Sequence, residues 1–154
     1  MQILLSKEEF GVALAAVQVG EPLRLFIVSG RALFRQAQDK LPAHKKNDYE
    51  NSEQGSDLSK SESMDQIYIN PELIKMSRTK KEKHEGCLSI RGKWGTVPRA
   101  EKATIRAYDE KGTLLTRGAS GFLAHVFQHE MDHLDGILYT DKTTNLYDEP
   151  SREK

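Results

Sequence analysis

The chain has 154 residues, with 23 Lys and Arg against 23 Asp and Glu, and 37% of its residues are hydrophobic. We therefore expect one soluble domain over residues 1–154, and the balanced charge argues against nucleic acid or an anionic membrane as a partner. No apolar run approaches the roughly 20 residues of a membrane span, and a single cysteine cannot form an internal disulfide. These features favour a cytoplasmic, reducing location.

The first half of the chain contains strand patterns separated by a long polar segment. Leu23 to Val28 is rich in branched and aromatic residues and predicts a mostly buried strand. From about 36 to 65 almost every residue is polar or charged, so this segment cannot offset its ordering entropy by burial, and we predict a mobile insertion. Gln66 to Pro71 predicts a second strand that ends at a turn, and Glu72 to Ser77 a further strand of mixed polarity.

The second half predicts short strands followed by one helix. The predicted strands are Thr96–Val97, Ala103–Tyr108 and Leu114–Thr116, with a hairpin turn at Asp109–Gly112. Ser120 can cap a helix over Gly121 to Leu134, and Gly136 lies just beyond its end as a stop signal. The expected fold class is α+β, with antiparallel strands packed around a central helix.

His129, Glu130 and His133 form an H-E-x-x-H pattern within the predicted helix. Residues four apart share one helix face, so both imidazoles can reach a single metal ion, with Glu130 beside it as a general base. The same pattern can occur on an ordinary solvated face. Its apolar flanks argue against that reading, because buried histidines need partners. A catalytic zinc-type site needs three protein ligands and an open position for water, so a third donor must come from elsewhere.

Cys87, the only cysteine, is the candidate for that third ligand. A lone cysteine is more often a small buried hydrophobe. A nucleophilic cysteine would need a histidine base and an orienting partner, which spacing alone does not reveal. The residues by themselves leave these three roles open.

Three segments together resemble the signature motifs of the peptide deformylase family, in the family's order. They are Gly11-Val12-Ala13-Leu14-Ala15-Ala16-Val17-Gln18, Glu85-Gly86-Cys87-Leu88-Ser89 and Gln128-His129-Glu130-Met131-Asp132-His133-Leu134. The resemblance runs from about Phe10 to Asp141, interrupted by the polar insertion. It implies a metal-dependent hydrolase that removes the N-formyl group from the N-terminal formylmethionine of newly synthesised polypeptides and releases formate. It also implies these nascent polypeptides as partners, with the ribosome as a further candidate.

The resemblance also implies roles for individual residues. Cys87, His129 and His133 would hold one divalent metal ion, usually Fe²⁺ in the cell and replaceable by Zn²⁺ or Ni²⁺. Glu130 would move the proton, and the side-chain amide of Gln18 and the backbone N–H of Leu88 would stabilise the oxyanion. The substrate is expected to pair as an added strand, with its methionine in an apolar pocket near the helix. The expected substrate-binding residues are Gly11, Val12, Ala13, Glu85, Gly86, Phe122 and His125.

Several positions depart from the family's pattern. A longer segment usually precedes the first motif, whereas ten residues precede Gly11 here, so we expect a packing layer to be missing. Ala13 replaces a glycine and should therefore adopt a negative φ. Phe122 and His125 replace aliphatic residues, and Trp94 stands where a basic residue is common. We expect Phe122 and His125 to make the methionine pocket narrower and more polar.

Two expectations concern the surroundings of the metal ligands. By resemblance, Arg99 and Glu85 form a buried pair that braces the cysteine loop. Asp132 should either face outward or orient a histidine.

Two other functions remain open at this point. One is another H-E-x-x-H metallopeptidase, with a downstream carboxylate such as Glu149 as its third ligand. The other is a deformylase-like protein of low activity that binds N-terminal peptides, because of the short segment before Gly11 and the alanine at position 13.

Overall fold

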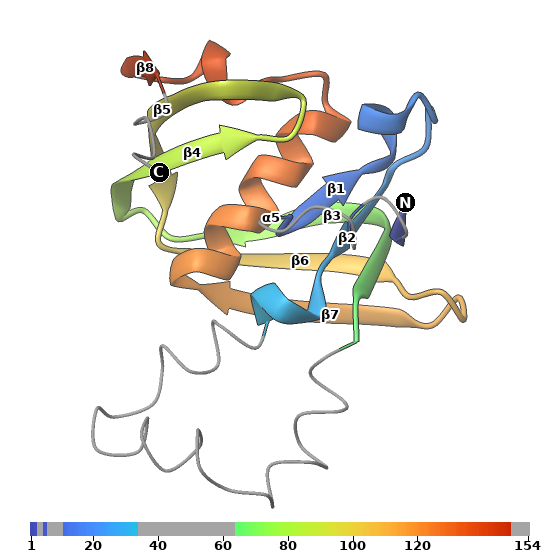
Figure 1. Ribbon diagram of the computed structural model, residues 1–154. Coiled ribbons are helices and arrows are strands. Elements are labelled where there is room, and N and C mark those ends of the chain that lie inside the picture. The colour runs from blue at the N-terminus through green and yellow to red at the C-terminus, as the bar shows by residue number, and fades with distance from the viewer. Residues whose placement is uncertain (3–4, 6–10, 34–63, 149–154) are drawn as a thin grey trace, which may run out of the picture.

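The computed structural model describes residues 1–2, 5, 11–33 and 64–148 (Figure 1). Two antiparallel sheets and one main helix, α5, make up this part of the chain, which confirms the expected mixed fold with antiparallel strands. The larger sheet has the order β1-β2-β3-β6-β7 and the smaller one the order β4-β5-β8. The strands are β1 (Ala13–Ala15), β2 (Leu25–Val28), β3 (Gln66–Met76), β4 (Lys80–Cys87), β5 (Ile90–Ala100), β6 (Lys102–Tyr108), β7 (Leu114–Ser120) and β8 (Asn145–Asp148).

The main helix of the described residues is α5 (Gly121–Leu134), and the short 3-10 turns η1 (Ala16–Val19) and η3 (Tyr139–Asp141) lie on the chain before and after it. Residues 30–33 are also helical. The predicted bounds of α5 are confirmed. Ser120 is its N-cap residue, and Gly136 takes the left-handed conformation, φ 73°, just after its end. Within the described residues, no helix is long and apolar enough to cross a membrane.

Helix α5 lies between the two sheets in Figure 1, and buried residues occupy two faces of the helix. Leu123, Phe127 and Met131 repeat every four residues and form one face, which joins the core of the larger sheet. His125, His129 and His133 repeat with the same spacing, displaced by two residues. Two residues correspond to about 200° around a helix, so the histidine stripe lies on the side opposite the apolar stripe. The fold therefore presents three histidines away from the core of the larger sheet.

An aromatic cluster at the centre of the larger sheet holds α5 in place. The rings of Phe26 on β2 and Tyr68 on β3 are 4.9 Å apart, and Phe127 of α5 meets Tyr68 edge-on at 5.4 Å. All three side chains are fully buried. Burial of such side chains is worth about 1.5 to 3 kcal/mol each, so this cluster makes a large contribution to the position of the helix.

Two strand predictions need correction. The segments 66–71 and 72–77, expected as separate strands, form the single strand β3, which ends at Met76. This strand is irregular because Asn70 has a φ of 47° and the pairing register shifts between Ile69 and Glu72. The smaller sheet was largely missed, since only 96–97 within β5 was predicted as a strand. Half of the residues of β4 are exposed and the strand carries no apolar alternation, so it gives no strand signal in the sequence.

The predicted polar insertion at about 36–65 lies outside the described residues except for its last two positions. The carboxylate of Asp65 accepts a hydrogen bond from the backbone N–H of Gly30 at 3.1 Å, directly before β3 begins. The single-domain prediction for residues 1–154 and the mobility of the insertion stay predictions.

Candidate active site

Cys87, His129 and His133 converge on one point beside α5. Cys87 ends β4, where a register shift precedes its pairing with Ile90, and the two histidines are one helical turn apart. The Sγ atom of Cys87 lies 3.3 Å from Nε2 of His133, and the Nε2 atoms of the two histidines are 3.1 Å apart. The ligand atoms of the three residues all lie within 4.8 Å of one another. One thiolate and two imidazoles in this arrangement can hold a divalent metal ion.

The electrostatics of this triad favour the thiolate form of the cysteine. Burial raises the pKa of Cys87, but hydrogen bonds with His129 and His133 outweigh it and lower the pKa to about 5. Burial lowers the pKa of His129, whereas its contacts with Cys87 and Glu85 outweigh this effect and raise the pKa to about 10. The thiolate is the form that binds metals, and a bound cation would take the place of the proton that His129 holds in its absence.

Glu85 fixes the orientation of His129. One of its carboxylate oxygens, Oε2, lies 2.8 Å from Nδ1 of His129, which leaves Nε2 of that ring directed at Cys87 and His133. A partner on the second ring nitrogen is the usual means of orienting a histidine ligand. Burial raises the pKa of Glu85, but hydrogen bonds from His125, His129 and Arg99 lower it far below its usual range. Glu85 is therefore ionised at neutral pH.

Arg99 links Glu85 to Asp132 in a buried charge network. The predicted pair is confirmed, since Nε and Nη2 of Arg99 donate to the Glu85 carboxylate at 2.7 and 3.0 Å. The Nη1 atom of Arg99 donates to Asp132 at 2.5 Å, and Lys142 donates to the other oxygen of Asp132 at 2.7 Å. The prediction that Asp132 faces outward or orients a histidine is therefore wrong. It is 9% exposed and holds two cations.

Glu130 follows His129 in the chain and is suited to exchange a proton. Its side chain is buried, and its Oε2 atom has no hydrogen-bond partner within the described part of the chain. Burial raises the pKa of Glu130 to about 7, although the nearby charges of His129 and His133 act in the opposite direction. A carboxyl group with a pKa near neutrality can both accept and release a proton during a reaction.

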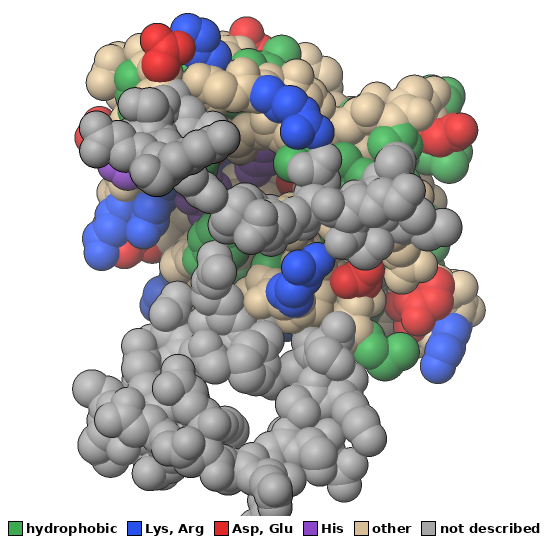
Figure 2. Space-filling model, in the orientation of Figure 1, with side chains coloured by type: hydrophobic (Ala, Val, Ile, Leu, Met, Phe, Trp, Pro, Cys, Tyr) green, Lys and Arg blue, Asp and Glu red, His purple; other side chains and the backbone are tan. Residues whose placement is uncertain are grey.

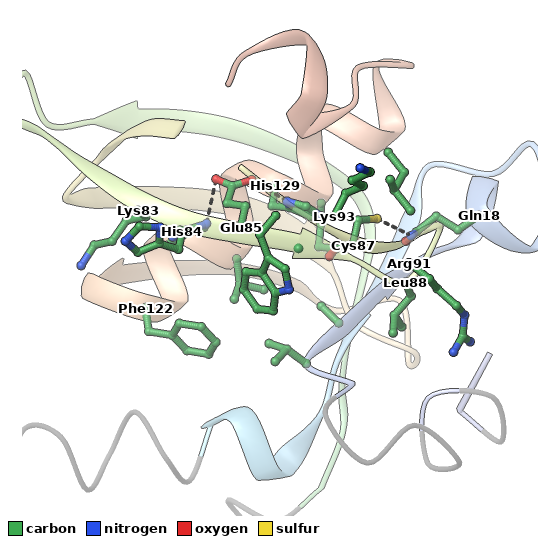
Figure 3. Close-up of a pocket in the computed structure, with 18 of the residues that line it drawn as sticks. Gln18, Lys83, His84, Glu85, Cys87, Leu88, Arg91, Lys93, Phe122 and His129 are labelled. Carbon is green, nitrogen blue, oxygen red and sulfur yellow. Dashed lines mark hydrogen bonds and ion pairs between the residues drawn. The ribbon is translucent and has the colours of Figure 1, made fainter. Parts of the chain in front are cut away.

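Gln18 approaches the cysteine from η1. Its Oε1 accepts a hydrogen bond from the backbone N–H of Ala15 at 2.8 Å, which fixes the direction of the amide. Its Nε2 then donates to Sγ of Cys87 at 3.4 Å and to Oγ of Ser89 at 2.9 Å. Figure 3 shows this amide directed at the cysteine, with Leu88 nearby. A hydrogen-bond donor is thus held beside the three converging ligand atoms.

A cavity of about 450 Å³ opens beside these residues and is the space available to a substrate. Its lining includes most of the predicted site residues: Val12, Ala13, Gln18, Glu85, Gly86, Cys87, Leu88, Phe122, His125, His129 and Glu130. Gly11 is buried but does not line the cavity, and neither does His133. Ala13 lies in β1 without a positive φ, as expected for an alanine at this position.

Several contacts of the site could not be found from the sequence. Nε2 of His125 lies 2.7 Å from Oε1 of Glu85, so His125 belongs to the charge network as well as to the cavity wall. The ring of Tyr139 stacks on His129 at 6.3 Å. Trp94 packs so closely on Gly86 that a Cβ there would lie 3.2 Å from the indole. These partners are between eight and forty positions apart in the chain, and no local pattern marks them.

Comparisons with known proteins agree with this geometry. The family model for polypeptide deformylase matches residues 1–149, and the chain belongs to this family. The peptide deformylase of Caulobacter vibrioides is 33% identical over 88% of this chain and 64% of its own length.

Solved structures show the same similarity. The crystal structure of a Synechococcus elongatus peptide deformylase in complex with actinonin has 30% identity and a TM-score of 0.63, over 88% of this chain and 57% of that one. The Arabidopsis thaliana peptide deformylase 1B in complex with an inhibitor has 26% identity and a TM-score of 0.68, over 94% of this chain and 64% of that one. The chain therefore spans less than two thirds of the length of these relatives.

Proposed function

We propose that the protein is a metal-dependent peptide deformylase, which removes the N-formyl group from the N-terminal formylmethionine of newly synthesised polypeptides and releases formate. The observation that carries the proposal is the convergence of ligand atoms of Cys87, His129 and His133 within 4.8 Å. Beside them lies the buried carboxylate of Glu130, whose Oε2 atom has no hydrogen-bond partner among the described residues. Membership of the polypeptide deformylase family supports it. Nascent polypeptides as substrates, the ribosome as a partner and a cytoplasmic location follow from the same proposal.

Cys87, His129 and His133 would hold one divalent metal ion, with Fe²⁺ as the first candidate and Zn²⁺ or Ni²⁺ as substitutes. When bound, this ion would supply a Lewis acid that lowers the pKa of water and polarises the formyl carbonyl. Glu85 holds His129 in the orientation that this role requires, because it occupies the other ring nitrogen.

Glu130 would move the proton. With a pKa of about 7 it can take a proton from the attacking water and deliver it to the amine that leaves when the formyl C–N bond breaks. Gln18 would donate from Nε2 to the oxyanion that forms in between, since its Oε1 is already fixed by Ala15. The backbone N–H of Leu88 would be the second donor.

The substrate end would occupy the cavity of about 450 Å³. Val12, Ala13 and Gly86 line it with small or apolar groups near which an extended peptide can lie, and Phe122 and His125 contribute from α5. Gly11, which does not line the cavity, would act by letting the β1 backbone approach the peptide closely.

The test is formate release from formyl-Met-Ala-Ser by protein loaded anaerobically with Fe²⁺ or Ni²⁺. The Glu130→Gln variant, loaded in the same way, is the matched control. Cleavage of an internal peptide bond would instead identify a metallopeptidase, for which the candidate third ligand Glu149 lies outside the described residues. Peptide binding by metal-replete protein without formate would identify a binding protein of low activity.

A further inference from the structure

The charged side chains around the cavity do not share the overall charge balance of the chain. Lys and Arg equal Asp and Glu at 23 each, yet the cavity lining has three cationic side chains at its edge, Lys83, Arg91 and Lys93. We refer to these three residues as the cationic rim. The acidic residues in the lining are Glu85 and Glu130, and both are buried. Since Glu85 pairs with Arg99 and Glu130 is buried, the charged side chains of the lining that reach solvent are all cationic.

The rim surrounds the cavity on more than one side. Lys83 comes from β4, whereas Arg91 and Lys93 come from β5. In Figure 3, Lys83 lies near Phe122 at one end, Arg91 lies near Leu88 at the other, and the charged ends of both point outward. Figure 2 shows histidines in a recess of this face with lysine and arginine side chains on several sides of it. Long cationic side chains commonly line a surface with their apolar stems and keep their charges in solvent.

The interaction that Lys93 already makes is weak enough for a ligand to compete with it. Lys93 lies 2.5 Å from Asp148 on β8, but the two side chains are 48% and 80% exposed. Exposed ion pairs contribute little because water and salt screen them. A negatively charged ligand at the mouth can therefore share or replace this partner.

We propose that the cationic rim selects substrates whose first few residues after the N-formylated one carry acidic side chains. This inference rests on the proposed deformylase function and names the class of peptide that the site prefers. The N-terminal residue of such a peptide enters the cavity toward Glu130, so the residues that follow it lie at the mouth, beside the rim. A peptide fits better than a nucleic acid, because the chain has zero net charge and the cations surround the entrance to a cavity with buried acidic groups.

The test measures peptide affinity through Trp94, the single tryptophan of the chain, which lines the cavity. The metal-loaded Glu130→Gln variant is titrated at low salt with formyl-Met-Ala-Asp-Asp-amide, its Asn-Asn counterpart and its Lys-Lys counterpart. The amidated ends remove the charge of the terminal carboxylate. Two or three exposed ion pairs predict about three- to tenfold tighter binding of the Asp peptide than of the Asn peptide, and weaker binding of the Lys peptide. In 1 M salt, where the Debye length is about 3 Å, the ratio should approach one.

Variants assign the preference to the rim. The double variant carries Lys83→Gln and Lys93→Gln. Its Asp peptide should bind at most about twice as tightly as the Asn peptide, because two weak ion pairs between the rim and the peptide are lost. Lys111→Gln is the matched control, since Lys111 is an exposed lysine in the turn between β6 and β7 and does not line the cavity. It should retain the full ratio.

Three outcomes would overturn the inference. The first is an Asp-to-Asn affinity ratio near one with the rim unsubstituted, and the second is a ratio that the double replacement leaves unchanged. The third comes from a parallel titration with an RNA oligonucleotide, if the double replacement weakens the binding of the RNA and not that of the Asp peptide. The affinity ratio does not depend on turnover. An absence of formate from every peptide with metal-replete wild-type protein would therefore contradict the proposed function, while the binding ratio still tests the rim. With active protein, the ratio of kcat/KM for the Asp and Asn peptides should follow the ratio of affinities.

Discussion

Nε2 of His125 lies 2.7 Å from Oε1 of Glu85, the carboxylate that also holds the metal-ligand candidate His129. His125 thus has two roles, because it lines the cavity and contributes to the charge network behind it. The same Glu85 oxygen also accepts a hydrogen bond from Nε of Arg99 at 2.7 Å. Glu85 therefore keeps a cationic partner on Oε1 when His125 is replaced.

His125→Ile should raise kcat/KM for formyl-Met-Ala-Ser, because an aliphatic wall suits a methionine side chain better than an imidazole. The gain should be roughly ten- to hundredfold at most, as expected for a small change in an apolar pocket. The free energy of unfolding, measured in urea, should fall by about 1 to 3 kcal/mol, because a buried hydrogen bond to a charged group is removed. An unchanged kcat/KM in a folded, metal-replete variant would show that His125 does not limit methionine binding.

Cys87→Ser should lose bound metal and activity together. With a pKa of about 5, the thiol of Cys87 is ionised at neutral pH and offers a soft sulfur ligand. A serine hydroxyl is not ionised at this pH and has no sulfur. Metal content per chain, measured after dialysis, checks the prediction. A variant that keeps a full equivalent of tightly bound metal at the same histidines would remove Cys87 from the ligand set.

Glu130→Gln should keep the metal and lose activity. The amide preserves the shape of the buried side chain but cannot accept a proton, so formate release should fall by at least about 10²-fold. Metal content equal to that of the wild-type protein is the control that separates this effect from a loss of the ion. Turnover close to wild type would assign proton transfer to another group.

The sequence predicts the centre of the site well because its residues lie in local patterns. The spacing of His129, Glu130 and His133 needs only a helix, and Ser120 and Gly136 mark both ends of that helix. Cys87 required the resemblance of its flanking residues to a family motif, since its place beside α5 depends on how β4 packs. Patterns of a few residues therefore predicted the three residues that converge, whereas several contacts around them could not be found in this way.

The surroundings depend on contacts between residues far apart in the chain. Glu85 and His125 are separated by forty positions, and Asp132 meets Arg99 across two different elements. Among the described residues, β4 pairs within its sheet only with β5. Half of its residues are exposed, and the strand lacks the alternation of a half-buried strand. No local pattern marks Lys83 and Lys93 as part of the cavity, because their place beside it depends on how β4 and β5 pack in the fold.

Arg99→Met should destabilise the fold by about 3 to 5 kcal/mol, because it leaves Glu85 and Asp132 as buried charges without their shared cation. Arg106→Met is the matched control, since Arg106 pairs with Glu72 through side chains that are 49% and 63% exposed. The control should change the free energy of unfolding by about 1 kcal/mol or less. Urea unfolding of both variants measures the difference. Equal losses would mean that the buried network does not contribute to stability through its charges.

Tyr68 should make the fold sensitive to alkaline pH. Burial of its phenol raises the pKa from 10.0 to about 12, with the charge of Arg117 acting in the opposite direction. Between these two values the unfolded chain loses the proton while the folded chain keeps it, so the stability contributed by this group is complete below pH 10 and is lost as the pH rises toward 12. A pKa difference of about two units between the folded and unfolded chain corresponds to a loss of about 2 to 3 kcal/mol in the free energy of unfolding. Tyr68→Phe removes the ionisable group from the same aromatic cluster, so its free energy of unfolding should fall less steeply from pH 10 to pH 12. Parallel curves for the two proteins would show that Tyr68 does not stay protonated in the folded state.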